Sequence, residues 1–459
     1  MSPSTATLVF AVGIAGLFML DRDRNVRTSL ALWLPVAWLC IGGSRMVSEW
    51  LQPPLPPGVS PAWTAAQTLD GSPLDRNVLM LFIAIGVMVL IGRRAKVHAL
   101  LWANVPILLF FIYCAVSTSW SDYPLVAFKR WIKAFGDLVM VLIILSDPDP
   151  AAAVKRVLAR MGFLLMPLSI LLIKYYPELG RGYENLTWVP VVTGVTTGKN
   201  LLGMICLLCG LSAEWRLLHV PRDVEGVRRY VIVHLTILLM ALSLFWQANS
   251  MTALSCFLMA TCVMLAVHVP TARRTALVHV VVASVLLLAF SAIFLDAGGN
   301  MLQTLGRDPT LTGRTQLWGV ALEYSGDPLL GTGFESFWLG ERLQRIWSIY
   351  WWHPNEAHNG YLEVFLNLGV VGVLLLGIVL VAGYRNVIRL LRHDPEAGAF
   401  RISYFVAAVA YNLTEAAIRT FQPIWVIFLL TIFAIPKTEP DAVVVPESAS
   451  GEPQAAPSY

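Results

Sequence analysis

The residues best suited to chemistry stand immediately before an apolar stretch near the C-terminus. Residues 347–359 read WSIYWWHPNEAHN, and His353, Glu356, His358 and Asn359 are packed into the second half of this segment. We expect His358 to be a general base, because an unperturbed imidazole titrates near neutral pH. A single histidine at such a border is more often structural than catalytic. Here its polar neighbours, which could orient the imidazole, favour the catalytic interpretation.

Basic residues on the expected outer side of the membrane form a second group of candidates. Lys129, Arg130 and Lys133 stand at the start of one apolar stretch, Lys199 opens another, and Arg314 begins an amphipathic pattern. The positive-inside rule disfavours cations at outer helix ends. They either extend to lipid phosphates or form a cationic pocket for a phosphorylated lipid, which Arg and Lys bind in different ways.

The composition shows which elements must hold these residues. Of the 459 residues, 57% are hydrophobic and only 14% are charged, whereas a soluble domain has about 25% charged residues. A membrane helix needs roughly 20 mostly apolar residues, and no alternating pattern of the β-barrel type is present. We therefore predict an all-α, polytopic membrane protein. No run of basic and aromatic residues indicates nucleic-acid binding.

The apolar stretches predict about 12–13 transmembrane helices. Thirteen require an outer N-terminus, and twelve follow if the first stretch does not cross. The expected spans are 4–20, 28–44, 77–92, 99–116, 130–146, 161–175, 200–215, 230–247, 251–269, 276–295, 358–383, 402–416 and 423–436.

Lys and Arg concentrate in alternate connections, which predicts the cytoplasmic side. The domains expected are an N-terminal transmembrane bundle (1–295), a long outer loop (296–357), C-terminal transmembrane helices (358–436) and a disordered cytoplasmic tail (437–459). Within the outer loop, Leu317, Trp318, Ala321 and Leu322 recur at helical spacing, so an amphipathic helix on the membrane surface follows Arg314. A loop of this length before the last three spans is usually functional.

Two polar stripes lie at outer helix ends. Asn359, Glu363 and Asn367 are spaced to share one side of a helix, and a polar stripe that enters the membrane indicates a lined cavity. Glu415 and Arg419 belong to the second stripe, with Asn412. The second stripe is equally well explained as a helix-end ion pair.

Several other chemistries are disfavoured. The DxD spacings at Asp21/Asp23 and Asp147/Asp149 fall on the expected cytoplasmic face, away from the other candidates, so a metal-held nucleotide sugar is not expected. Glycine loops that bind nucleotides are absent. The six cysteines all fall in apolar stretches, where buried thiols are more common than metal or redox sites. We expect no metal and no cofactor.

The motifs resemble those of a known superfamily. His358-Asn359, nine residues, Gly369, two residues and Gly372 match the H-N-x9-G-x-x-G pattern of bacterial O-antigen ligases. TGKNLLG at 197–203, TGRTQLW at 312–318 and PLLGTGFESFW at 328–338 also resemble its recurrent segments. The superfamily includes O-antigen polymerases and exopolysaccharide polymerization proteins of the rhizobial type.

The resemblance implies a metal-independent, inverting glycosyltransferase in the bacterial inner membrane, with its active site and long loop facing the periplasm. Its donor would be an undecaprenyl-pyrophosphate-linked oligosaccharide, and its acceptor a glycan or the lipid A core. Arg314, with Lys199 and Arg130, would hold the pyrophosphate, while His358 would orient or deprotonate the acceptor hydroxyl. His353, Glu356, Asn359, Glu415 and Arg419 are further candidates for substrate binding.

Four functions remain open at this stage. Polymerization in exopolysaccharide or O-antigen biosynthesis is preferred, and ligation to the lipid A core is the near alternative. A polysaccharide or lipid-linked saccharide transporter or flippase is a different class of protein. It is disfavoured because the cations cluster at the outer face, whereas a translocation path needs polar groups at both ends. The last is a non-catalytic membrane scaffold.

Overall fold

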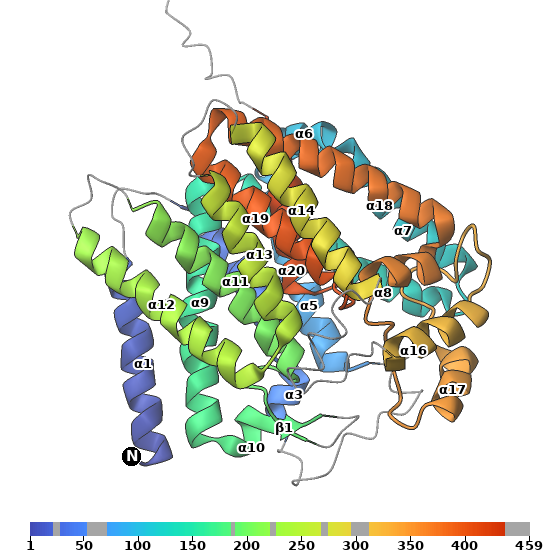
Figure 1. Ribbon diagram of the computed structural model, residues 1–459, viewed down its shortest axis with the longest axis horizontal. Helices are drawn as coiled ribbons and strands as arrows, with labels where there is room; N and C mark the ends of the chain where they lie inside the picture. Colours follow the sequence, from blue (N-terminus) through green and yellow to red (C-terminus); the bar gives the residue numbers. More distant parts are fainter. Residues whose placement is uncertain are drawn as a thin grey trace, which may run out of the picture.

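The computed structural model describes residues 1–21, 28–52, 71–184, 189–220, 226–267, 274–294 and 312–436, and nearly all of this is helix (Figure 1). The tail expected at 437–459 and the first part of the long outer loop, 296–311, lie outside the described residues. The domain boundaries therefore stay predictions.

The elements follow the predicted apolar stretches closely. The first half of the chain contains α1 (Pro3–Leu20), η1 (Leu30–Leu32), α2 (Trp33–Gly42), α3 (Val47–Leu51), α5 (Pro73–Ile91), α6 (Arg94–Ala103), α7 (Val105–Ser117), η2 (Thr118–Trp120), α8 (Pro124–Leu145), α9 (Pro150–Tyr175), α10 (Pro177–Gly180), β1 (Arg181–Tyr183) and β2 (Pro190–Val192). The second half contains α11 (Lys199–Leu218), α12 (Val227–Ala248), α13 (Met251–Val267), α14 (Arg274–Phe294), α16 (Thr312–Glu323), α17 (Gly340–Ile349), α18 (Gly360–His393), α19 (Pro395–Tyr411) and α20 (Pro423–Ile432).

The all-α, polytopic prediction is confirmed. Among the described residues, α1, α5, α9, α11, α12 and α18 are long and apolar enough to cross a membrane. The bent pair of α6 with the segment Val105–Trp120 would make a seventh crossing, and four further apolar helices are shorter. The count of 12–13 spans stays a prediction.

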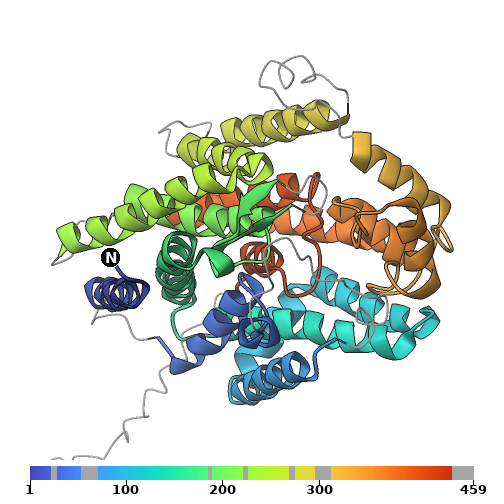
Figure 2. The ribbon, with the colours of Figure 1, turned by 90° about the horizontal axis from the view of Figure 1, so that it is seen from below.

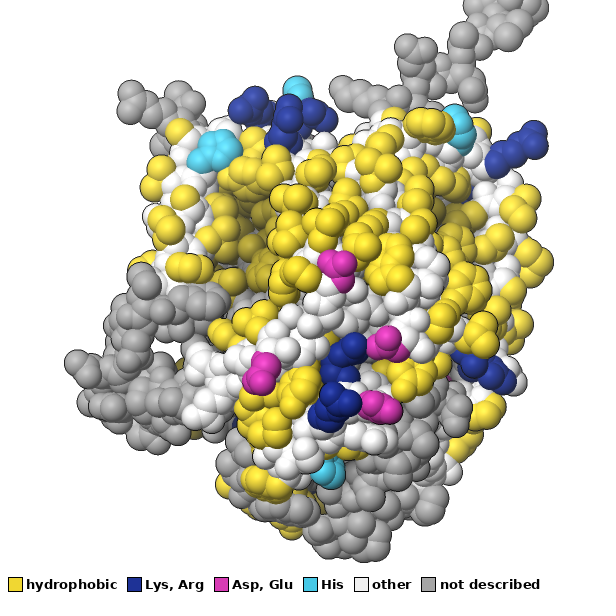
Figure 3. All heavy atoms as spheres, turned by 90° about the vertical axis from the view of Figure 1, so that its right-hand side faces the viewer, with side chains coloured by type: hydrophobic (Ala, Val, Ile, Leu, Met, Phe, Trp, Pro, Cys, Tyr) yellow, Lys and Arg dark blue, Asp and Glu magenta, His cyan; other side chains and the backbone are white. Residues whose placement is uncertain are grey.

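Buried and exposed helices are clearly separated. α20 and almost all of α19 are buried, as are the second half of α8 and most of α11. α1, α5 and α12 lie at the rim and expose large apolar side chains such as Leu8, Leu81 and Trp246. Hydrophobic side chains cover the upper part of one face, and charges of both signs gather lower down (Figure 3). An apolar exterior of this kind suits lipid contact.

Two local features were not predicted. The single span expected at 99–116 is divided at Asn104, where α6 and α7 are bent by 90°. Pro106, at the start of α7, cannot donate the backbone hydrogen bond that a continuous helix would need. In addition, β1 and β2 form a short antiparallel pair that the apolar pattern does not predict.

The helix expected after Arg314 is present as α16. Its residues Leu317 and Ala321 are fully buried in a cluster with Leu343 and Ile346 of α17, a helix that was not predicted. Figures 1 and 2 both place α16 and α17 at the end of the molecule away from α1. The outer loop thus has its own small core. The membrane-surface position of α16 stays a prediction.

α18 breaks at Gly369, which has φ 62° and ψ −165°. The break frees backbone groups, and the segment 328–333 of the outer loop binds them. Thr332 N donates to Leu366 O (3.1 Å) and Gly333 N to Asn367 O (2.8 Å), while Val370 N donates to Pro328 O (2.9 Å). Buried backbone groups in apolar surroundings must be satisfied within the protein, so this pairing fixes the outer segment against α18.

We predict that Gly369→Ala destabilises the protein. A Cβ at this position would lie 2.2 Å from Leu329 O, and the backbone conformation alone costs about 1–3 kcal/mol for a residue other than glycine. The thermal unfolding midpoint in detergent measures the effect. Gly377→Ala in the same helix is the matched control, because a Cβ there meets nothing within 4 Å. Equal midpoints for the two variants would contradict the prediction.

Candidate active site

His358 lies in the turn that precedes α18. Its own backbone is in the left-handed region, with φ 50°. The next residue, Asn359, is the N-cap of α18, and its side-chain oxygen accepts hydrogen bonds from Tyr361 N and Leu362 N, both at 3.0 Å. Its amide also donates to Leu413 O (3.2 Å). Asn359 therefore fixes the position of His358 by capping the helix.

The imidazole of His358 lies between two carboxylates. Nδ1 is 3.0 Å from Glu356 Oε1 and 3.4 Å from Glu415 Oε2. Each carboxylate in turn pairs with an arginine: Glu356 with Arg419 (2.5 Å) and Glu415 with Arg314 (3.1 Å). We call these five residues the His358 cluster. Three elements contribute to it: the turn before α18, α16, and the segment between α19 and α20.

Further contacts hold Glu415 in place. Asn200, at the start of α11, donates to Glu415 Oε1 (2.9 Å). Gly360 N donates to the carbonyls of Asn412 (2.8 Å) and Glu415 (3.1 Å), and Arg314 also donates to Thr414 O. The segment after α19 is thereby tied to both α11 and α18, and Asn200 joins the site although the sequence did not single it out.

The electrostatics favour a protonated histidine. Burial alone would lower the pKa of His358, but its hydrogen bonds to Glu356 and Glu415 and their negative charges raise that pKa to about 10. Burial works in the opposite direction for Glu356, yet His358 and Arg419 lower its pKa to about 2. At neutral pH the cluster then has three cations against two carboxylates. It carries an excess positive charge and suits an anionic ligand.

The protonation state affects the role expected for His358. A ring that carries both protons donates hydrogen bonds and cannot accept a proton. The imidazole would have to lose the proton at Nε2 before His358 could act as a base. The position of Nδ1 between the carboxylates of Glu356 and Glu415 favours the same state, in which His358 orients a ligand and stabilises negative charge.

The other predicted residues fall in three places. Lys199 pairs with Glu184 (2.6 Å), outside the His358 cluster. The ring of His353 stacks on Trp347, with centroids 4.6 Å apart, and its structural contacts lie within the outer loop. Arg130 lies in α8 and donates to Glu335 O. The three residues expected to hold one pyrophosphate, Arg314, Lys199 and Arg130, thus have different immediate partners.

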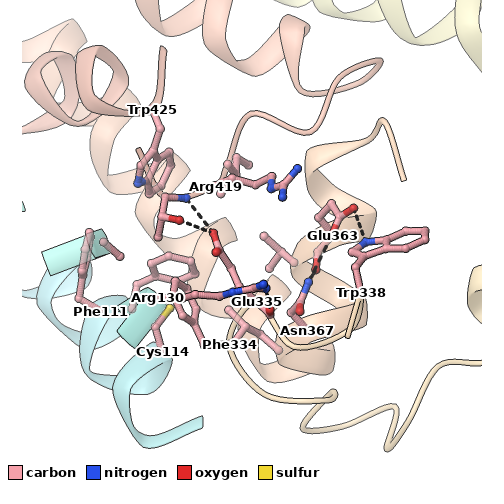
Figure 4. Close-up of a pocket in the computed structure, with 16 residues that line it drawn as sticks. Phe111, Cys114, Arg130, Phe334, Glu335, Trp338, Glu363, Asn367, Arg419 and Trp425 are labelled. Atoms are coloured by element: carbon pink, nitrogen blue, oxygen red, sulfur yellow. Dashed lines mark hydrogen bonds between the residues drawn. The ribbon is translucent and has the colours of Figure 1, made fainter. Parts of the chain in front are cut away.

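Arg130 lines a pocket next to the His358 cluster (Figure 4). Arg419 belongs to both, because it lines the pocket and pairs with Glu356. Glu363 and Asn367, which the helical spacing placed on one side of α18, also line this pocket. These two residues of the polar stripe therefore line a cavity, as expected. Glu335, which the sequence analysis missed, projects from the outer segment into the same space. The resemblance of its segment, PLLGTGFESFW, was the one signal that could have identified it.

Three groups of the His358 cluster could also reach one metal ion. Glu356, His358 and Glu415 each offer a ligand atom, and these atoms lie within 4.8 Å of one another. A divalent cation there would have to compete with Arg314 and Arg419 for the carboxylates. Metal independence stays a prediction.

Comparisons with known proteins agree with the resemblance. Residues 235–377 match the family model described as O-antigen ligase, a stretch that includes Arg314, His358 and Gly369. The chain is 24% identical over 338 residues to the exopolysaccharide production protein ExoQ of Rhizobium meliloti (strain 1021). This similarity covers 72% of the chain and 75% of that protein.

We predict that Glu356→Gln lowers the pKa of His358. The raised pKa means that the ion pair stabilises the fold fully below about pH 6.5 and that this contribution is lost as the pH rises through about 10. Diethylpyrocarbonate attacks only the unprotonated ring, so at pH 7.5 the variant should react roughly tenfold faster at His358 than the wild type. Peptide mass spectrometry measures the rate, with exposed His393 as the internal reference. Equal rates at His358 would refute the ion-pair assignment.

Proposed function

From the premise that the chain belongs to the O-antigen ligase-related family, with a role in polysaccharide biosynthesis, we propose a specific activity for it. The protein transfers a glycan from an undecaprenyl-pyrophosphate-linked donor on the periplasmic face of the bacterial inner membrane. The reaction extends a polysaccharide chain, and transfer to the lipid A core is the alternative outcome.

One observation carries this proposal. His358 sits between two carboxylates, and each carboxylate is paired with an arginine, so that cations and proton acceptors alternate across a few ångströms. Displacement of a pyrophosphate needs positive charge to stabilise the leaving group and an acceptor for the proton of the attacking hydroxyl. The His358 cluster contains both kinds of group.

The proposed step forms a bond from the acceptor oxygen to the anomeric carbon and breaks the bond from that carbon to the pyrophosphate oxygen. The electron pair of the broken bond stays on the pyrophosphate, whose charge Arg314 and protonated His358 offset. The acceptor's proton passes to Glu415, the carboxylate of the cluster that pairs with Arg314. Attack opposite to the leaving group inverts the anomeric centre.

Purified protein in lipid nanodiscs, incubated with undecaprenyl-pyrophosphate oligosaccharide, tests the activity. We expect glycan products longer than the donor unit, and a rate roughly 10²–10³-fold lower for Arg314→Ala or His358→Ala. Arg345→Ala is the matched control, because this arginine is 64% exposed and pairs with Glu341 on the same helix. Lengthened products without added lipid A core would identify a polymerase.

Two results would contradict the proposal. One is unchanged turnover in both His358→Ala and Arg314→Ala. The other is the absence of any transfer combined with movement of the lipid-linked saccharide across liposomes, which would identify a flippase.

A further inference from the structure

The pocket beside the His358 cluster has walls from the membrane helices and the outer loop. The helices α7, α8, α18 and α20 supply its walls, and Phe334, Glu335, Trp338 and residues 418–420 complete it (Figure 4). His358 pairs with Glu356, and Glu356 pairs with Arg419. Arg419 also lines the pocket. The pocket is therefore next to the reacting centre, by way of Arg419 and Glu356.

The polar groups of the pocket carry both signs. Arg130 and Arg419 offer hydrogen-bond donors, while Glu335 and Glu363 offer acceptors. A phosphate group presents acceptor oxygens alone, and in this pocket the guanidinium groups do not outnumber the carboxylates as the cations do in the His358 cluster. A hydroxyl group both donates and accepts, and a lining with equal numbers of guanidinium and carboxylate groups suits several hydroxyls at once.

Aromatic side chains form much of the remaining wall. Phe111 and Trp425 come from α7 and α20, and Phe334 and Trp338 come from the outer segment. The C–H faces of a sugar ring pack on flat aromatic surfaces, while its hydroxyls reach polar groups at the edges. Pockets with apolar walls and a few convergent polar groups are typical of small-molecule sites.

Glu335 is held in an uncommon conformation. Its φ is 46°, in the left-handed region that residues other than glycine rarely adopt. Its Oε1 accepts hydrogen bonds from Thr420 N (2.9 Å) and Thr420 Oγ1 (2.8 Å). These bonds join the outer segment to the residue that follows Arg419. Backbone strain of this kind concentrates at ligand sites.

We propose that this pocket binds the terminal saccharide of the glycan acceptor and brings its hydroxyl to the His358 cluster. The inference rests on the proposed function and adds to it a separate acceptor subsite. The donor pyrophosphate is then held at Arg314, and Arg419 stands between the two substrates. Glu335 is the residue that distinguishes the subsites, because it touches the acceptor and not the donor.

Steady-state kinetics of Glu335→Gln, with donor and acceptor varied independently, test the proposal. The amide keeps an oxygen that can accept from Thr420 but removes the charge. We expect the KM for the acceptor to rise at least tenfold, while the KM for the donor changes less than twofold. Glu341→Gln is the matched control, because this carboxylate is 85% exposed; both of its KM values should equal those of the wild type.

A rise in the donor KM alone, or no change in either KM, would overturn the acceptor subsite. Binding of the free, lipid-free acceptor oligosaccharide gives a second readout that does not need turnover. Saturation-transfer difference NMR should detect it with the wild type and much more weakly with Glu335→Gln. Inorganic pyrophosphate is also added to compete with the oligosaccharide. If it displaces the signal equally well in the wild type and in Arg314→Ala, the phosphates bind in the pocket and the proposal is refuted. If the wild type binds the oligosaccharide through Glu335 but transfers nothing, the proposed function fails and the saccharide site stands.

Discussion

The site depends on the satisfaction of backbone hydrogen bonds at a helix break within the membrane protein. α18 is not a continuous helix through Gly369, and backbone groups freed in apolar surroundings must be satisfied within the protein. Residues 328–333 bind them, and this pairing fixes the segment that carries Phe334, Glu335 and Trp338. Trp338 then donates to Glu363 of α18 (2.8 Å), and Asn367 accepts from Ser336 N (2.7 Å). One glycine therefore couples the outer loop, the pocket and the helix that follows His358.

Two acidic residues position Arg419 through the backbone that follows it. Glu335 binds Thr420, and the fully buried Asp137 of α8 accepts from Phe421 N (2.9 Å) and from Trp38 Nε1 (2.7 Å). The backbone next to Arg419 is thus held by side chains from the outer loop and from a membrane helix. A buried carboxylate is tolerated only when its oxygens are hydrogen-bonded, and here its two partners, Trp38 and Phe421, also pack edge to face, with centroids 4.8 Å apart. The guanidinium can then reach Glu356 without the loss of entropy that a mobile loop would impose.

The sequence predicted the helices well because apolar length is a local property, and thirteen expected spans each correspond to at least one helix. The prediction failed where apolar length alone does not decide where a helix begins and ends. Pro106 divided one span. The helix α17 was missed because it is only 10 residues long and packs inside the outer loop. For the candidate site, the H-N-x9-G-x-x-G spacing pointed to His358, the outer cations to Arg314, and the second polar stripe to Glu415 and Arg419. The structure brings these residues together, but Glu415 pairs with Arg314 and Arg419 with Glu356, so the expected helix-end pair is not formed. Spacing could not show that Lys199 pairs with Glu184, or that Asn359 is a helix cap, because both depend on tertiary contacts.

The alternation of charges in the His358 cluster also explains why a positive site can remain stable before its ligand arrives. Three cations gathered alone would repel one another strongly in a partly buried place. Glu356 and Glu415 offset that repulsion and use their oxygens to orient three side chains. An anionic group that binds Arg314 competes with Glu415 for the same guanidinium, so binding of the ligand would release Glu415 from its cationic partner. Binding of the leaving group would thereby free a carboxylate for the proton of the attacking hydroxyl. The same contacts that hold the cluster together would then link its two chemical tasks.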